Sequence, residues 1–317
     1  NGKNQKQLTI EPGVHKTKLS PDNKYLLDQF SDINVPGITQ LINTKNNEKR
    51  ILNIAKNPLE GYVIGTTELV NLKSNNNLDL HARIIKPSYF NEKEKYPVLV
   101  YVYGGPHAQL VTNSWLGGSS LWMYWMAEQG YIIFTLDGRG SANRGFEFES
   151  AIFRNLGEIE MEDQISGIEY LKNLNFVDSN KLAVHGWSYG GFMTTSLMTR
   201  YPNIFKVGVA GGPVIDWKWY EVMYGERYMD TPKSNKEGYE SSSLLNYVKY
   251  LKGNLLLIHG TVDDVVVMQH NLAYIKKSIE EGIHVDFFPY PMHKHNVRGK
   301  DRIHLMEKVL NYIILKN

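Results

Sequence analysis

Two patterns of hydrophobic and polar residues divide the chain. Up to about residue 55, short alternating segments are separated by polar turns, which is typical of antiparallel strands with one face in solvent. These segments are 24–30, 38–43 and 50–54, and further strands with a hairpin turn at 75–77 are expected over 61–86. The first part of the chain is therefore predicted to hold a few strands with little hydrophobic core of their own.

From about residue 97, short apolar runs alternate with longer segments of helical pattern. The runs predict buried strands at 98–103, 131–136, 182–185, 207–210 and 255–258. The segments between and after them predict helices over 121–129, 159–174, 191–200, 269–281 and 301–314. Such alternation is typical of a mostly parallel sheet with helices on both faces. The sequence thus predicts an α/β fold.

Composition narrows the range of functions. The 317 residues include 35 Lys and Arg against 33 Asp and Glu, so the net charge is only +2 and nucleic acid is not an expected partner. The absence of cysteine excludes disulfides, thiolate metal sites and a cysteine nucleophile. No apolar run reaches the roughly 18 residues of a membrane span. Because the sequence begins at Asn1 without an initiator methionine or a signal peptide, we expect a fragment or a mature product.

The most informative segment is Gly186-Trp187-Ser188-Tyr189-Gly190, which follows a short apolar strand and precedes a predicted helix. In α/β-hydrolases, the serine of Gly-x-Ser-x-Gly lies on a tight strand-to-helix turn that exposes its hydroxyl above the sheet. The helix N-terminus then offers free N–H groups to a developing oxyanion. A chance occurrence of the motif is the alternative, but its context predicts an α/β-hydrolase fold with Ser188 as the nucleophile.

The acid and the base of this fold follow the serine along the chain. After the run 255–258 come Asp263 and Asp264; their order favours Asp263 as the acid and Asp264 as a turn residue or a helix N-cap. His293 and His295 lie in a loop after a predicted strand at 285–290, and because they alternate, only one should face the serine. The residues alone leave that choice open. A zinc site on the same pair lacks further ligands, so no metal is expected.

Four motifs together resemble the prolyl oligopeptidase family, and most of all its dipeptidyl peptidase IV branch with the bacterial dipeptidyl and prolyl tripeptidyl peptidases. They are Tyr103-Gly-Gly-Pro106, Asp137-Gly-Arg-Gly140, Gly186-Trp-Ser-Tyr-Gly-Gly191 and His259-Gly-Thr-Val-Asp-Asp264. The resemblance covers about 60–317. It implies that 59–317 form the catalytic α/β-hydrolase domain and that 1–58 are the end of an N-terminal β-propeller, whose remainder is a missing partner from the same full-length protein. It also suggests a periplasmic or cell-surface location in a bacterium.

The resemblance also assigns roles to individual residues. Matching the loop 290–302 to the family places the catalytic base at His295. The Tyr103 hydroxyl and the Tyr189 backbone N–H would donate to the oxyanion. A compact apolar pocket for proline would be formed by Tyr189, Val214, Trp217, Tyr220, Tyr224 and Val266. The spacing of Trp217, Tyr220 and Tyr224 predicts one helical face, for which an ordinary core face is the alternative.

The function implied is a serine exopeptidase that releases N-terminal di- or tripeptides after proline through an acyl-enzyme. Its partners would be peptides with proline near the N-terminus; no cofactor is expected, and surplus apolar residues of the last helix suggest a homodimer. One departure concerns Val265, which stands where dipeptidyl peptidase IV has an asparagine that helps to hold the substrate backbone. The alternatives are a carboxylesterase-type hydrolase and a catalytically inactive interaction module.

Overall fold

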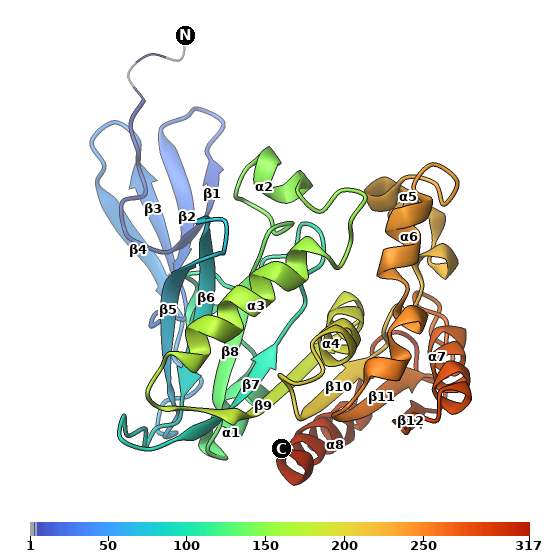
Figure 1. The fold of residues 1–317 in the computed structure, drawn as a ribbon. Helices are drawn as coiled ribbons and strands as arrows, with labels where there is room; N and C mark the ends of the chain where they lie inside the picture. Colours follow the sequence, from blue (N-terminus) through green and yellow to red (C-terminus); the bar gives the residue numbers. More distant parts are fainter. Residues whose placement is uncertain (1–2, 4) are drawn as a thin grey trace.

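The computed structural model describes residue 3 and residues 5–317, so the chain start at Asn1 lies outside the described residues. These residues form two β-sheets, one of four strands and one of eight (Figure 1). The four-stranded sheet is antiparallel throughout. The eight-stranded sheet is mostly parallel and is covered by helices.

The small sheet is formed by β1 (Val14–Leu19), β2 (Tyr25–Ser31), β3 (Ile38–Asn43) and β4 (Lys49–Ile54). The last three confirm the strands expected from alternation. Strand β1 was not predicted, because its residues are mostly polar and four of the six are exposed, so it has no apolar face. Strand β1 is held by its backbone pairing with β2 along its whole length.

The large sheet has the strand order β12-β11-β10-β9-β7-β8-β6-β5. Its strands are β5 (Thr66–Lys73), β6 (Asp79–Lys86), β7 (Tyr96–Tyr101), β8 (Ile132–Asp137), β9 (Val177–Trp187), β10 (Val207–Gly211), β11 (Asn254–Gly260) and β12 (Asp286–Tyr290). Strands β7 to β12 pair in parallel, and the β5–β6 hairpin adds an antiparallel edge. The five buried strands and the hairpin predicted from the sequence are therefore confirmed.

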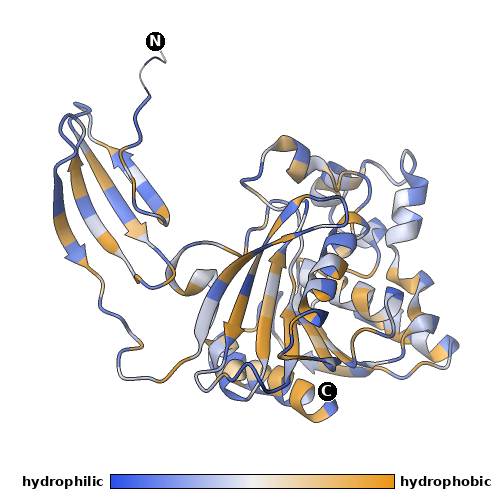
Figure 2. Ribbon diagram, turned by 60° about the vertical axis from the view of Figure 1, so that its left-hand side comes forward, coloured by the Kyte–Doolittle hydropathy of each residue, from blue (hydrophilic) through white to orange (hydrophobic). Residues whose placement is uncertain are grey.

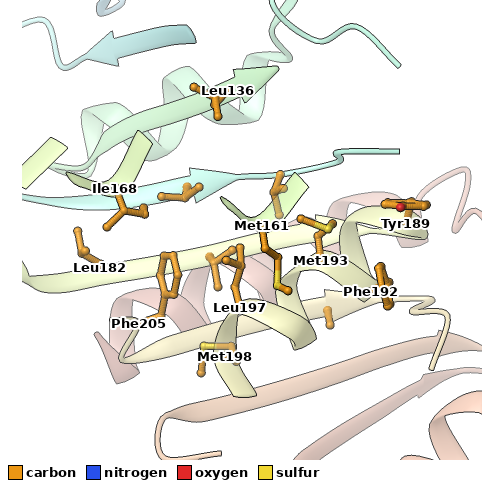
Figure 3. Packing of buried hydrophobic residues seen from close by; sticks show 14 of the residues in the cluster. Leu136, Met161, Ile168, Leu182, Tyr189, Phe192, Met193, Leu197, Met198 and Phe205 are labelled. Carbon is orange, nitrogen blue, oxygen red and sulfur yellow. The ribbon is translucent and has the colours of Figure 1, made fainter. Parts of the chain in front are cut away.

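Both faces of this sheet are buried. Along β9, Leu182 and Val184 pack with the cluster of α3 (Ile159–Lys172), α4 (Tyr189–Arg200) and α7 (Gln269–Glu280), whereas Ala183 packs with α1 (Leu121–Glu128) and α8 (Asp301–Lys316). Figure 3 shows residues of the first of these layers, among them Leu182 of β9, Ile168 of α3 and Leu197 of α4. The predicted mostly parallel sheet with helices on both faces is thus confirmed.

Shorter helices occupy the connections. They are η1 (Trp115–Gly118), α2 (Phe146–Ser150), η2 (Trp217–Trp219), α5 (Val222–Met229), α6 (Lys236–Ser242), η3 (Leu244–Asn246) and η4 (Val248–Tyr250). Within the described part of the chain, no helix combines the length and the apolar character that a membrane crossing requires.

The small sheet stands beside the large one on a single extended connection between β4 and β5 (Figure 2). Residue 58, the predicted domain boundary, falls within this connection. The two parts also touch through backbone groups near η1: the amide of Trp115 donates to the hydroxyl of Ser31 at 2.8 Å, and the amide of Leu116 donates to the carbonyl of Ile33 at 3.2 Å. The functional residues predicted from the sequence all belong to the large sheet and its loops.

Candidate active site

The predicted serine, aspartate and histidine come from three loops at one edge of the large sheet. Ser188 follows β9, Asp263 follows β11 and His295 follows β12, and these strands run parallel, so their carboxyl ends meet. A cavity of about 440 Å³ opens at this edge. Both Ser188 and His295 line it, together with Tyr103 and Tyr220.

Ser188 occupies a sharp turn between β9 and α4. Its backbone angles, φ 62° and ψ −118°, are unusual for a residue with a side chain and are typical of strain at a functional position. The neighbouring glycines explain how the turn fits: a Cβ on Gly186 or on Gly190 would lie 2.4 Å or 2.2 Å from the carbonyl oxygen of Val102. The motif therefore forms a tight strand–turn–helix that directs the serine into the cavity.

Asp263 and His295 form a direct hydrogen bond. Oδ2 of Asp263 lies 2.8 Å from Nδ1 of His295, and Oδ1 accepts the backbone N–H groups of Val265 and Val266 at 2.9 Å each. Burial alone would raise the pKa of Asp263, but hydrogen bonds from His259 and His295 and from the Val265 amide outweigh burial and lower it. The carboxylate is thus charged at neutral pH and fixes the orientation of the His295 ring.

The neighbouring candidates point elsewhere. Asp264 is exposed and its carboxylate contacts the ammonium of Lys294 at 2.5 Å. Nε2 of His293 lies 2.7 Å from the carboxylate of Asp301, at the start of α8. The alternation of His293 and His295 therefore separates them, and of these two histidines it is His295 that reaches Asp263.

The backbone around His295 is held by two further contacts. The indole N–H of Trp187 donates to the carbonyl oxygen of His295 at 2.8 Å. Gly212 lies against the ring, where an added Cβ would approach Cε1 of His295 to 3.3 Å. In the described residues no hydrogen bond joins the Ser188 hydroxyl to His295; such catalytic contacts are commonly long until substrate binds.

Tyr103 and Tyr189 lie next to each other beside the serine, with ring centroids 6.1 Å apart. Tyr103 follows β7 and lines the cavity, and burial raises the pKa of its phenol, so its hydroxyl keeps the proton that a donor needs. Tyr189 is the first residue of α4, where a backbone N–H has no partner within the helix. Both groups are therefore available as donors at this edge of the sheet.

The Tyr189 side chain forms a buried hydrogen-bonded pair with Glu160, which was not predicted from the sequence. Its hydroxyl lies 2.5 Å from Oε1 of Glu160 on α3, and Oε2 of Glu160 accepts the amide of Gly157 at 3.0 Å. Burial raises the pKa of Glu160 to about 8, so this carboxyl is largely protonated at neutral pH. Nothing in the sequence distinguishes Glu160 from the exposed acidic residues of the same helix.

Aromatic side chains form a compact group behind the serine. Trp217 is buried, with its ring centroid 5.3 Å from Tyr189, 5.5 Å from Tyr220 and 5.9 Å from Tyr224. The expected single helical face is wrong: η2 ends at Trp219, Tyr220 is extended and α5 begins only at Val222. A turn, not a continuous helix, brings the rings together.

The remaining predicted pocket residues differ in exposure. Val214 and Val266 are buried in the same hydrophobic cluster as Trp217. Val265 is 43% exposed and lines the cavity, where its side chain offers no hydrogen-bonding group. Among the described residues, no group of three or more His, Cys, Asp or Glu side chains is arranged to hold a metal ion.

Comparison with known proteins identifies relatives of this chain. Residues 118–315 match the model of the prolyl oligopeptidase family. The chain is 34% identical to human dipeptidyl peptidase 8 over 245 residues, which are 76% of this chain and 27% of that protein. A protein from Bacteroides ovatus described as a dipeptidyl aminopeptidase IV has a similar crystal structure, with a TM-score of 0.94, 51% identity and 97% of this chain covered. Dipeptidyl peptidase 4 of Porphyromonas gingivalis has a TM-score of 0.91 at 31% identity and 98% coverage. The chain spans 44% of each of these two structures.

Proposed function

Because this chain belongs to the prolyl oligopeptidase family and has an α/β-hydrolase fold, we propose that it is the catalytic part of a serine peptidase that cleaves after proline. The hydrogen bond between His295 and Asp263, at the rim of the cavity that Ser188 lines, is the observation that carries the proposal. The relatives are more than twice as long as this chain, and we propose that residues 1–58 are the end of the β-propeller that precedes the catalytic domain 59–317 in the full-length protein.

In the proposed reaction, His295 takes the proton of the Ser188 hydroxyl as the oxygen attacks the scissile carbonyl. Asp263 stabilises the imidazolium that forms, because its carboxylate is charged and hydrogen-bonded to Nδ1. His295 then gives the proton to the leaving amine. Water, deprotonated by the same imidazole, releases the acyl group and restores the serine.

The oxyanion of the tetrahedral intermediate would be held by the Tyr189 backbone N–H and the Tyr103 hydroxyl. The first donor lies in the first turn of α4 and the second lies two residues after β7, so both are fixed by the large sheet and its helices and little reorganisation is needed during the reaction. The hydrogen bond from Tyr189 to Glu160 supports this arrangement, because it fixes the side chain of the residue whose amide donates.

The aromatic group would receive the proline that precedes the cleaved bond. A proline ring is apolar and has no N–H within a peptide, so a rigid apolar wall suits it. The wall consists of Tyr189, Val214, Trp217, Tyr220, Tyr224 and Val266. Release of an N-terminal di- or tripeptide is the finer part of the proposal, and Val265 would leave the substrate backbone without the side-chain hydrogen bond expected at that position.

The proposal is tested by hydrolysis of Gly-Pro-, Ala-Ala-Pro- and Ala-Ala-p-nitroanilides and of a short p-nitrophenyl ester, with Ser188→Ala as the control. We expect turnover that requires proline and disappears in the variant, and the preferred length will distinguish dipeptide from tripeptide release. Turnover of the ester alone would instead identify a carboxylesterase-type hydrolase. Failure of a fluorophosphonate probe to label Ser188 would favour the inactive interaction module.

A homodimer also stays a prediction. Helix α8 buries Leu305, Val309, Leu310 and Ile313 against the sheet but exposes Ile303 and Leu315 at 63% and 81%. Light scattering over a concentration series will test it, and a constant monomer mass would remove it.

A further inference from the structure

A second imidazole contacts the same carboxylate as His295. His259 lies near the end of β11, its side chain is fully buried, and its Nε2 is 3.3 Å from Oδ2 of Asp263. That oxygen is also the one that lies 2.8 Å from Nδ1 of His295. The proposed reaction makes no use of His259.

The contacts of His259 fix the position of its proton. Nε2 lies 2.6 Å from the carbonyl oxygen of Val266, and since a carbonyl oxygen only accepts, Nε2 carries a proton. Nδ1 lies 3.0 Å from the side-chain amide nitrogen of Asn271 on α7, which donates, so Nδ1 accepts. The fully buried Asn271 therefore selects the tautomer in which Nε2 donates to the Val266 carbonyl, with Oδ2 of Asp263 3.3 Å from the same nitrogen.

Both oxygens of the Asp263 carboxylate are held by neighbouring groups. Oδ1 of Asp263 accepts the amides of Val265 and Val266, and Oδ2 accepts from His295 and lies 3.3 Å from Nε2 of His259. The carbonyl oxygen of Val266 accepts the Nε2 proton of His259. This hydrogen bond anchors the loop that carries Asp263 to the end of β11, the strand that precedes it. With all of these donors in place, the carboxylate cannot rotate without breaking a buried hydrogen bond.

We propose that His259, oriented by Asn271, is a positioning residue for the reaction of Ser188. It holds the Asp263 carboxylate in the orientation in which Oδ2 accepts the Nδ1 proton of His295. This inference rests on the proposed function, because it concerns the same three residues, but it assigns a role to a buried pair that never touches the substrate.

The test compares three variants of the whole chain. His259→Phe keeps an aromatic ring but removes the donor, His259→Gln keeps an N–H donor but loses the ring, and Asn271→Leu removes the amide that selects the tautomer. The first readout is the rate at which a fluorophosphonate labels Ser188. The second is the far-downfield proton NMR resonance of the hydrogen bond between His295 and Asp263, and thermal unfolding shows that each variant is folded.

We expect His259→Phe and Asn271→Leu to slow labelling about ten-fold or more, because a small misorientation of a catalytic group is costly. Their downfield resonance should shift or broaden, and His259→Gln should recover part of the rate. The matched control is His270→Phe, another buried imidazole beside Asn271, which accepts the Ile215 amide at 3.0 Å and has no hydrogen bond to Asp263. It should label within about two-fold of the parent.

Labelling that falls as much in His259→Gln as in His259→Phe would show that ring packing matters rather than the donor, and would overturn the proposal. An unchanged resonance in folded His259→Phe and Asn271→Leu would overturn it as well. A parent chain that does not label would count against the proposed function instead, and the resonance would still decide whether His259 orients Asp263.

Discussion

The two sheets of this molecule differ in what covers them. In the large sheet, neighbouring residues of a single strand enter two separate hydrophobic clusters, one on each face. In the small sheet, burial is confined to a few positions such as Leu26 and Ile42, while Ile51, Leu52 and Ile54 of β4 are at least half exposed. The site, with its strained serine turn and buried charges, lies entirely on the sheet that is covered on both faces. A rigid scaffold is what such strain requires.

The largest expected effect comes from Asp263→Asn, which tests the site on the large sheet. The asparagine amide would donate to Nδ1 of His295, which moves the ring proton to the nitrogen that must accept from Ser188. We expect fluorophosphonate labelling of Ser188 to fall by about 10³ to 10⁴ with little change in unfolding temperature. The control in the same loop is Asp264→Asn, whose surface contact with Lys294 has no part in the reaction. Equal losses in both variants would contradict the assignment of Asp263.

The next test compares the packing of the two sheets by replacing one leucine with alanine in each of them. Leu257→Ala in β11 removes a fully buried side chain and should cost about 2–5 kcal/mol in the free energy of unfolding. Leu52→Ala in β4, where the side chain is 50% exposed, should cost less than about 0.5 kcal/mol. Denaturant titration measures both. A similar cost at the two positions would mean that the small sheet is packed in solution against something, such as a second copy of the chain.

The elements that could be predicted from the sequence belong mainly to the large sheet, which is buried on both faces. The buried strands and helices were predictable because two-sided burial leaves uninterrupted apolar runs, and the tight turn at Ser188 was predictable because it requires glycine at positions 186 and 190. Strand β1 was missed because backbone pairing, not an apolar face, holds it. The bend at Tyr220 was missed because the spacing of its aromatic residues matches a helix equally well.

The supporting residues of the site were harder to predict than its reactive ones. Glu160 and Asn271 lie on helices that also carry exposed polar residues, so only the three-dimensional packing shows that their side chains are buried. His259 stands directly after an apolar run and is the first residue of the motif that contains Asp263, so the sequence carried a signal for it. Local pattern therefore indicates the groups that we propose to react, whereas long-range packing decides which polar groups lie against them.

The third test concerns Glu160, the carboxyl buried under Tyr189. Its folded pKa of about 8 lies above the ordinary value of 4.5, so the folded state binds the extra proton between these values. The stability it contributes is present below pH 4.5 and is lost as pH rises toward 8, by at most about 1.4 kcal/mol per pH unit. Glu160→Gln should flatten this part of the profile of unfolding free energy against pH.

The control for this profile is Glu169→Gln on the same helix, where the carboxylate is exposed and pairs with Lys172. It should leave the slope between pH 4.5 and 8 unchanged. If Glu160→Gln leaves the slope unchanged too, the buried carboxyl is not the group that takes up the proton.

The smallest expected effect comes from a buried polar cluster on the small sheet, which is compared with an exposed ion pair on the large sheet. The carboxylate of Asp28 is fully buried, 2.9 Å from Nδ1 of His15, and accepts the amide of Gln40 at 2.8 Å. Asp28→Asn should destabilise this sheet by about 0.5–1.5 kcal/mol, seen as faster hydrogen exchange in β1 to β3. Asp79→Asn, which breaks the exposed ion pair with Lys73 on the large sheet, should leave the free energy of unfolding nearly unchanged. The opposite ranking would show that stability depends on which sheet a residue belongs to rather than on its own burial.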